Sequence, residues 1–295
     1  MARLPDFVII GAARCGTTSL HAYLREHPRV FMSSEKETDY FSLGDLPPDE
    51  VPALAAAWRA KTRAEYERFF RDAGDARAVG EASPTYLFYP RSAERMRQAI
   101  PDAKLICVLR DPVERAYSHH ALARKMGFET EPDFEAAVAL EDERWRSDRS
   151  MRFTYVRASL YHDGLAEFFR RFPRDRILVL PFEELAADTA GTMRRIHEFL
   201  GVDPEFVPDV GIRHNRSMLP KIGLVREAFG RPFRLRRFLQ RNLPPRLVTQ
   251  LGNVIMRPPP GIPSDVRARL LPRFVDDVRR LEDLLARDLA AWRSI

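Results

Sequence analysis

Short apolar runs alternate with longer amphipathic stretches over the first two thirds of the chain. Helical spacing of apolar positions fills the intervals at 18–26, Arg91–Ala99 and 160–172. Continuous apolar runs are typical of strands buried on both faces, and strands that alternate with helices are typical of a parallel sheet. We therefore predict an α/β fold of three layers, a central parallel sheet with helices on both faces. The apolar runs that predict its strands are 7–10, Val30–Met32, 78–80, 105–109 and 177–180.

The remaining segments read as helices and loops. Residues 43–71 are polar and mostly helical, 133–145 read as a surface helix, and 193–200 as a helix that ends at Gly201. Prolines at 258–260 break the chain, and Ser264 has the chemistry of an N-cap for a long last helix. We expect a single domain over 1–295, with a basic helical segment at about 221–257 and a C-terminal helix at about 264–292.

Composition narrows the class of protein. Of the 295 residues, 45% are hydrophobic and 31% charged, as in soluble globular domains. We find no apolar run near the ~18 residues of a membrane span and no signal-peptide pattern, so we expect a cytoplasmic protein. Two cysteines make neither a disulfide framework nor a zinc site, and we expect no metal requirement. Five lysines against 43 arginines suggest a GC-rich bacterial genome.

Positive charge is concentrated in one segment. Residues 221–246 hold eight basic residues and one acid, a local charge of +7 against +6 for the whole chain. Because the remainder is near neutral, a general nucleic-acid binder is not expected. Three interpretations stay open: a solvated face, a lid over an acceptor site, or a surface that docks peripherally on anionic lipid.

The first apolar run leads into a glycine-bracketed loop. Gly11 and Gly16 have the G-x-x-x-x-G spacing of a P-loop, and Thr18 fills its Ser/Thr position, but Thr17 stands where that motif has lysine. Backbone N–H groups of such a loop, with the N-terminus of the next helix, bind anions, and Arg14 adds a planar donor fork. The alternative is an ordinary strand–helix turn. The combination favours an anion site in a P-loop-like fold.

A second basic group follows another strand. Arg110 ends the run at 105–109, Pro112 fits the first turn of a new helix, and Ser118 lies on that helix. Ligands of open parallel sheets bind beyond the carboxyl ends of the strands. Arg110 and Ser118 therefore suit a second phosphate. The alternative is a structural pair between Arg110 and a carboxylate.

Together these motifs resemble the sulfotransferases that use 3′-phosphoadenosine 5′-phosphosulfate (PAPS), in particular the glycan-type and bacterial ones. Residues 14–19 resemble the family's 5′-phosphosulfate loop, and Arg110 with Ser118 eight residues later resembles its 3′-phosphate motif. Residues 35–41 are similar to its Lys-Glu-x-x-Phe/Tyr-Phe segment, and 80–86 to its Glu-x-Ser/Thr-Pro-x-Tyr segment. Further similarities are Tyr161, 172–173, 177–180 and the late loop 214–217.

The resemblance implies roles for individual residues. Glu37 would be the catalytic base, with Lys36 either orienting it or touching the donor sulfate, and Arg14 would act on the leaving phosphate. His120 is a further catalytic candidate, because some members carry a histidine shortly after the serine; the alternative is a helix-surface residue. The residues implied to bind PAPS, or its product adenosine 3′,5′-bisphosphate (PAP), are Arg14, Cys15, Gly16, Thr17, Thr18, Ser19, Arg110, Ser118, Tyr161, Arg216 and Lys221.

The implied activity is sulfuryl transfer from PAPS to a hydroxyl, or an amine, of a glycan, glycolipid or natural product. Two departures weaken a heparan-type assignment: Ala82 replaces a frequent lysine, and no cysteine follows Cys107. One alternative is a P-loop kinase or NTPase, against which Thr17 and Arg110 argue, since Walker motifs need lysine and aspartate there. The other is a non-catalytic module that binds a nucleotide or a membrane.

Overall fold

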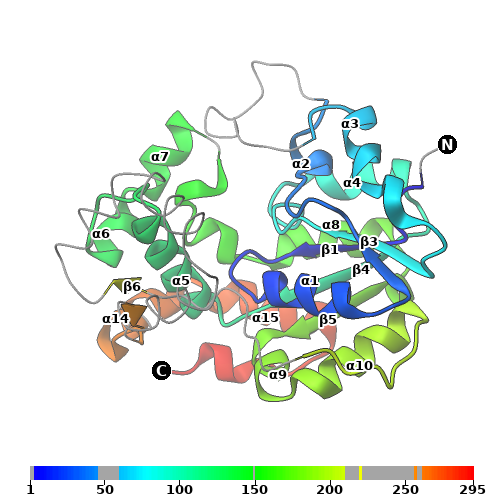
Figure 1. Ribbon diagram of the computed structural model, residues 1–295. Coiled ribbons are helices and arrows are strands. Elements are labelled where there is room, and N and C mark those ends of the chain that lie inside the picture. The colour runs from blue at the N-terminus through cyan, green and yellow to red at the C-terminus, as the bar shows by residue number, and fades with distance from the viewer. Residues whose placement is uncertain (1–2, 46–59, 149, 210–218, 221–255, 258–260) are drawn as a thin grey trace.

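The computed structural model describes residues 3–45, 60–148, 150–209, 219–220, 256–257 and 261–295. A five-stranded parallel sheet, in the order β2-β3-β1-β4-β5, lies at its centre (Figure 1). In a separate two-stranded antiparallel sheet, β6 (Leu219–Pro220) pairs with β7 (Met256–Arg257). The strands of the central sheet are β1 (Phe7–Gly11), β2 (Val30–Met32), β3 (Ala78–Ala82), β4 (Lys104–Leu109) and β5 (Ile177–Pro181).

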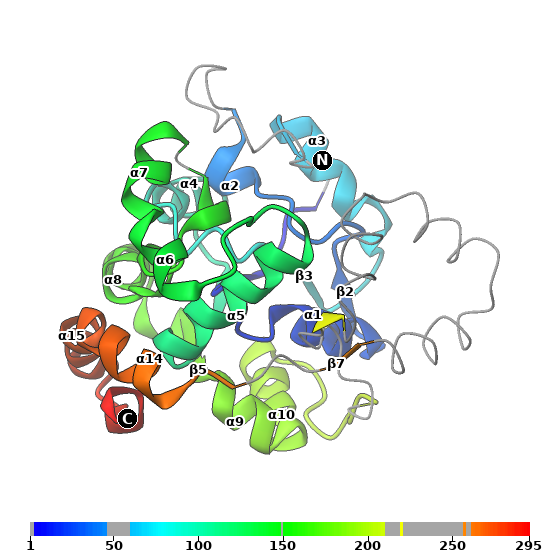
Figure 2. The ribbon, with the colours of Figure 1, turned by 90° about the vertical axis from the view of Figure 1, so that its left-hand side faces the viewer.

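The sheet is buried on both faces, as its sequence predicts. Every residue of β1 and β3 is buried, and β1 pairs with β3 on one side and β4 on the other. Two helices, α1 (Thr17–Glu26) and α10 (Thr189–Leu200), lie on one face, and α4 (Arg91–Ala99) and α8 (His162–Arg171) on the other (Figures 1 and 2). The predicted three-layer α/β fold is confirmed.

The other helices lie around this frame. Helix α5 (Pro112–Lys125) begins where β4 ends, so its N-terminus lies at the carboxyl edge of the sheet. The short α2 (Tyr40–Leu43) follows the loop after β2. The remaining α-helices with described bounds are α3 (Arg63–Glu67), α6 (Phe134–Ala139), α7 (Glu141–Ser147), α9 (Phe182–Ala187), α14 (Ser264–Leu270) and α15 (Val275–Leu285).

The prediction of one long C-terminal helix over 264–292 is wrong, because two helices form there instead. Helix α14 begins at Ser264 without a side-chain cap, and a 3₁₀ turn at Leu271–Arg273, which contains Pro272, separates it from α15. Proline has no N–H to donate to the preceding turn, which accounts for the break. Helix α15 ends where Ala286 adopts a left-handed φ of 50°. The helix expected over 133–145 is likewise divided into α6 and α7.

The C-terminal helices dock on the carboxyl edge of the sheet. Arg267 of α14 donates to both carboxylate oxygens of Asp111, at 3.1 and 2.6 Å. Asp111 in turn accepts from the N–H groups of Val113 and Glu114 and so caps α5. Asp277 of α15 accepts from the backbone of Tyr161 at 2.8 Å. The last thirty residues therefore support the region after β4.

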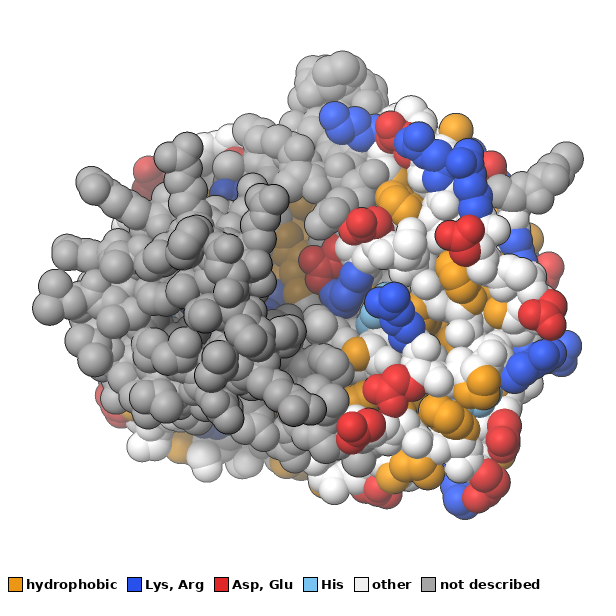
Figure 3. All heavy atoms as spheres, viewed as in Figure 1, with side chains coloured by type: hydrophobic (Ala, Val, Ile, Leu, Met, Phe, Trp, Pro, Cys, Tyr) orange, Lys and Arg blue, Asp and Glu red, His pale blue; other side chains and the backbone are white. Residues whose placement is uncertain are grey.

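Charges of both signs are interspersed over the described part of the face in Figure 3, at its right-hand half. No described helix is long and apolar enough to cross a bilayer. Most of the basic segment predicted at 221–257 lies outside the described residues, as does all of 221–246.

His197 of α10 makes folding sensitive to acid. It is wholly buried, and burial, followed by the charge of the neighbouring His27, lowers its pKa to about 4. The unfolded chain takes up this proton near pH 6.5, so stability is full above that pH and is lost as the pH falls towards 4. At pH 5 we expect the loss from this group to be about 2 kcal/mol.

Urea unfolding of the wild type and His197→Phe at pH 7 and pH 5 measures this loss. Phenylalanine has no proton to take up, so the variant should lose less stability than the wild type between the two pH values. The comparison isolates His197, because every other titrating group is shared. Equal losses in the two proteins would contradict the assignment.

Candidate active site

The loop between β1 and α1 has the backbone of an anion-binding turn. Arg14 and Gly16 have left-handed φ values of 72° and 83°. A Cβ on Gly16 would also lie 3.0 Å from the Phe182 ring, so glycine is required there on two counts. Hydrogen bonds among the described residues use the N–H groups of Ala12, Cys15 and Leu20, but not those of Gly16 and Thr17. These two groups can donate to a ligand.

The structure brings Arg14 and Ser118 together. Arg14 Nε donates to Ser118 Oγ at 3.1 Å, which joins the loop to α5 across 104 positions of sequence. Burial, followed by the charges of Arg115 and Arg110, lowers the pKa of Arg14 to about 10. Arg14 is still charged at neutral pH. The charges of Arg115 and Arg110 therefore repel that of Arg14, and an anion bound beside Arg14 offsets that repulsion.

Arg115 is the site residue that sequence reasoning missed. It is wholly buried, and its Nε donates to the carbonyl oxygen of Ala13 in the loop at 3.1 Å. Its Nη1 donates to the carbonyls of Thr154 and Tyr155, both at 3.2 Å, and its Nη2 contacts His119 Nδ1 at 2.9 Å. Burial lowers its pKa. Among the described residues, no carboxylate lies within ion-pair distance of it.

A signal for Arg115 was present in the sequence. It precedes Ser118 by three positions on a helix, so both side chains lie on one face.

Arg110 stands at the carboxyl end of β4, as predicted. Its Nη2 donates to Glu114 at 3.1 Å, and its guanidinium lies 5.1 Å from the centroid of the Phe182 ring. The ion pair between Arg110 and a carboxylate, which was the alternative interpretation, therefore exists. Both side chains of that pair are partly exposed, at 23% and 35%, and such pairs contribute only about 0–1 kcal/mol. The pair leaves Arg110 available to a stronger anion.

Cys15 and Tyr161 connect the loop to the end of β4. Both side chains are buried, with Cys15 Sγ 4.0 Å from Tyr161 Oη. The Tyr161 hydroxyl donates to the carbonyl of Arg110 at 2.9 Å. Burial raises the pKa of Cys15 to about 11, so its thiol is uncharged. That these two side chains touch a donor stays a prediction.

Other predicted donor-binding residues lie on α1 or beyond the described part of the chain. Thr17, Thr18 and Ser19 form the first turn of α1, where Thr17 is buried and the other two are partly buried. Arg216 and Lys221 lie outside the described residues.

Glu37 follows β2 at the same edge of the sheet. Its side chain is 56% exposed and pairs with Lys36. Its charge raises the pKa of Arg14, which sets the carboxylate within electrostatic reach of the loop. A carboxylate that is more than half exposed is accessible to an acceptor. That Glu37 is the general base stays a prediction.

His120 is buried on α5. Its Nε2 lies 3.0 Å from the carbonyl oxygen of Glu131, and its ring packs near those of Phe134 and Tyr155. Burial lowers its pKa, so the ring is neutral. The helix-surface alternative is wrong, because His119 and His120 are both buried. A catalytic role for His120 stays a prediction.

A parallel sheet that carries a glycine-bracketed anion loop after its central strand, with basic groups at the next strand end, defines a P-loop-like α/β protein. The sequence profile described as "Sulfotransferase family" matches residues 5–206. The chain belongs to the sulfotransferase family, as its motifs predicted.

The sequences of known sulfotransferases are similar to this chain. The chain is 30% identical over 207 residues to human heparan sulfate glucosamine 3-O-sulfotransferase 6, covering 68% of this chain and 53% of that protein. It is 37% identical over 117 residues to the membrane-associated sulfotransferase kil1 of Dictyostelium discoideum, covering 40% and 22%. The chain thus spans about half, or less, of the length of these relatives.

A solved structure matches over the full length. The crystal structure of a sulfotransferase from Alicyclobacillus acidocaldarius aligns with a TM-score of 0.77 and 33% identity, covering 99% of this chain and 100% of that chain. This match supports the sulfotransferase assignment over the kinase alternative.

Proposed function

We propose that this protein transfers a sulfuryl group from PAPS to a hydroxyl, or an amine, of a glycan, glycolipid or natural product. One observation carries the proposal: Arg14 of the loop donates to Ser118 of α5 at 3.1 Å, where the charges of Arg115 and Arg110 lower its pKa and that of Glu37 raises it. A donor with a phosphosulfate at one end and a phosphate at the other supplies negative charge that offsets the repulsion between these arginines. Its sulfur is the electrophile that a base-activated acceptor attacks.

The residues present fit such a donor. Arg14 and the N–H groups of Gly16 and Thr17 suit the 5′-phosphosulfate, and Arg110 with Ser118 suits the 3′-phosphate. In the reaction, an acceptor oxygen forms a bond to sulfur while the bond from sulfur to the phosphate oxygen breaks. Glu37 accepts the acceptor's proton. Arg14 stabilises the charge that develops on the leaving phosphate, as in phosphoryl transfer.

The acceptor class draws support from the relatives. One is named for heparan sulfate, and another, 26% identical over 249 residues, is carbohydrate sulfotransferase 15 of Rattus norvegicus. These names favour a glycan acceptor. Ala82, at the position where such enzymes frequently have lysine, argues against a heparan-type one.

Transfer of label from [³⁵S]PAPS tests the function. The acceptor panel contains neutral and acidic oligosaccharides, a glycolipid, a phenol and an amine, with water as the reference acceptor. We expect one class to be labelled above water. Tight PAP binding without labelling of any acceptor would favour the non-catalytic module, and labelling from [γ-³²P]ATP instead would favour a kinase.

Arg110→Ala is expected to weaken PAP binding by ten- to a hundredfold, because a charge-assisted contact to phosphate is lost. Isothermal titration calorimetry measures the Kd. Arg63→Ala is the matched control, since Arg63 also pairs with a glutamate four residues later, at 2.6 Å, on α3. An unchanged Kd for Arg110→Ala would assign Arg110 to the structural pair with Glu114.

Other expectations remain predictions. These are the cytoplasmic location, the single domain, independence of metal and the docking of 221–246 on anionic lipid. The described residues contain no group of three metal-binding side chains.

A further inference from the structure

Glu81 of β3 is a buried acid whose partners among the described residues are hydroxyl groups. It is wholly buried, and its Oε1 accepts hydrogen bonds from Tyr66 and Tyr86 at 2.9 and 2.7 Å. Its Oε2 lies 3.0 Å from Thr38 Oγ1 and accepts from Ser83 at 2.8 Å. Burial raises its pKa. Among the described residues, no lysine or arginine pairs with it.

Thr38 connects this acid to the proposed catalytic turn. It is wholly buried and stands between Glu37 and Asp39, which both have left-handed φ values, 61° and 54°. Each such residue costs of order 1–3 kcal/mol and persists only where the surroundings over-determine it. Thr38 points inwards to Glu81, and Glu37 remains exposed on the other side.

The turn is also fastened to the end of β3 on either side of Thr38. The N–H of Glu37 donates to the carbonyl of Ala82 at 2.9 Å. The N–H of Asp39 donates to Ser83 Oγ at 3.2 Å, and Ser83 is itself bonded to Glu81. Of the four hydroxyl groups that contact Glu81, two thus belong to residues that form or hold the turn, Thr38 and Ser83.

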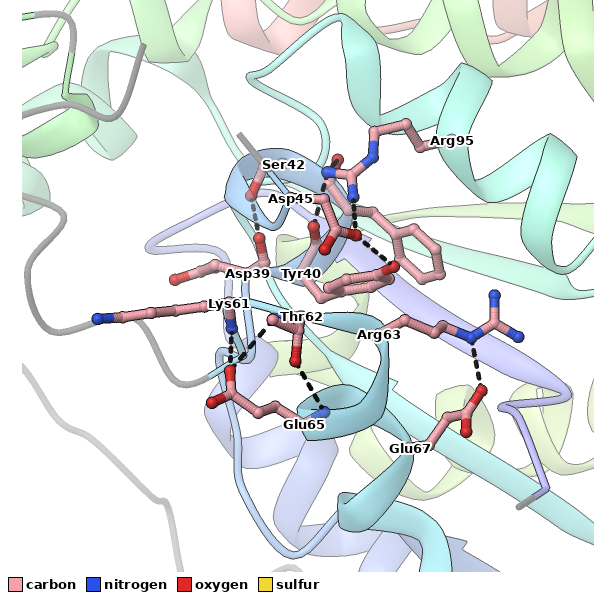
Figure 4. A network of polar contacts seen from close by, with 11 residues as sticks. Asp39, Tyr40, Ser42, Asp45, Lys61, Thr62, Arg63, Glu65, Glu67 and Arg95 are labelled. Carbon is pink, nitrogen blue, oxygen red and sulfur yellow. Dashed lines mark hydrogen bonds and ion pairs between the residues drawn. The ribbon is translucent and has the colours of Figure 1, made fainter. Parts of the chain in front are cut away.

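Figure 4 shows the support that follows the turn in α2. Arg95 of α4 donates to the carbonyls of Tyr40 and Phe41 at 2.8 and 3.1 Å. The Tyr40 hydroxyl donates to Asp45 at 2.7 Å. The turn is thus held at its start by Ala82, after its end by Arg95, and in its middle by the contact of Thr38 with Glu81.

We propose that Glu81 is a positioning residue for Glu37, acting through Thr38 and Ser83 to hold the left-handed turn that presents Glu37 to the donor site. The inference rests on the proposed function, since it assigns Glu37 the role of base. Glu81 is inaccessible to substrate, so its effect is on geometry alone.

Proton counting indicates how Glu81 acts. The Thr38 hydroxyl has one proton but lies within 3.0 Å of both Glu81 Oε2 and Tyr86 Oη. The hydroxyl of Tyr86 already donates to Glu81. If Thr38 donates to Tyr86, then the proton between Thr38 and Glu81 comes from a neutral carboxyl group. A glutamine at position 81 fits most of this pattern: its carbonyl accepts from the two tyrosines and its amide donates to Thr38, while the Ser83 hydroxyl has to turn from donor to acceptor.

The chain offers a matched pair of variants. Thr38→Val and Tyr66→Phe each remove one of the hydroxyl groups that contact Glu81, but only Thr38 belongs to the turn. Tyr66→Phe keeps the ring that stacks on Tyr40 at 4.6 Å. We expect Thr38→Val to lower kcat ten- to a hundredfold, since small displacements of a catalytic group have effects of this size. Its KM for PAPS and its Kd for PAP should stay within twofold, and Tyr66→Phe should keep kcat within threefold.

The measurement uses [³⁵S]PAPS with the acceptor of the panel that the wild type labels fastest, water included. Glu81→Gln should keep kcat within threefold of the wild-type value, whereas Glu81→Ala should lower kcat by more than that. If Glu81→Ala fails to fold, the comparison of Thr38→Val with Tyr66→Phe still decides. Equal losses of kcat in those two variants, or none in Thr38→Val, would overturn the positioning role.

Failure of the proposed function has a different signature. If the wild type labels no acceptor, or Glu37→Gln matches it, then Glu37 is not the base. Amide hydrogen exchange of peptide 34–42 then tests the network itself, and faster exchange in Thr38→Val than in Tyr66→Phe is expected. Equal exchange in the two variants would overturn the inference on that ground.

Discussion

Replacing Glu37 by glutamine is expected to lower kcat by a factor of about 10²–10⁴, the range that general base catalysis contributes. The amide has nearly the shape of the carboxylate but cannot accept the acceptor's proton. Because the side chain is 56% exposed and its backbone N–H bonds to Ala82, the substitution should not disturb folding. The measurement is single-turnover transfer from [³⁵S]PAPS, with PAP binding followed by calorimetry.

Glu35→Gln is the control for this prediction. Glu35 lies two residues earlier in the same segment, so its substitution removes the same charge near the site. We expect Glu35→Gln to retain kcat within threefold and both variants to bind PAP as the wild type does. A loss of PAP affinity in Glu37→Gln that matches its loss of kcat would assign Glu37 to binding. Equal kcat in wild type and Glu37→Gln would exclude it as the base.

Local patterns were sufficient for the sheet and the anion loop. Strands such as β1 and β4 are continuous apolar runs because both faces of the sheet are covered, and no tertiary information is needed to see that. The glycine at position 16 is likewise demanded by the backbone conformation of its own loop. These features are encoded within a few residues, so the sequence predicts them.

Features that depend on distant contacts could not be predicted in the same way. Arg115 reaches Tyr155, forty positions away, and Thr38 reaches Glu81, forty-three positions away. The sequence places Arg115 on the same helix face as Ser118 and Thr38 in a loop, but it does not show what either residue contacts. The family motifs indicated that the segment of Glu81 matters, but only the structure shows that its carboxylate contacts four hydroxyls and no cation among the described residues.

The missing P-loop lysine also has a physical interpretation in the structure. Positive charge reaches the loop from Arg14 within it, from Arg110 at the end of β4 and from Arg115 on α5. Arg115 in addition holds the loop itself, through the carbonyl of Ala13. The loop thus depends on α5 for both its shape and its charge, so the loss of Arg115 should lower stability.

Replacing Arg115 by methionine is expected to lower the free energy of unfolding by about 3 kcal/mol, because each buried carbonyl left without its donor costs about 1–3 kcal/mol. Methionine fills a similar volume but donates no hydrogen bond. The carbonyls of Ala13, Thr154 and Tyr155 then lose the donor that they share in the interior. Part of this cost is offset because a buried guanidinium no longer has to be desolvated. Urea unfolding measures the change.

Arg124→Met is the control, because Arg124 lies on the same helix and is only partly buried. We expect it to change stability by no more than about 0.5 kcal/mol. Arg115→Met should also weaken PAP binding, since the loop loses both a nearby charge and the bond that holds Ala13. Saturating PAP should therefore stabilise the variant less than the wild type, because stabilisation by a ligand follows its affinity. A variant as stable as the wild type, with the same shift on adding PAP, would show that the loop holds its shape without Arg115.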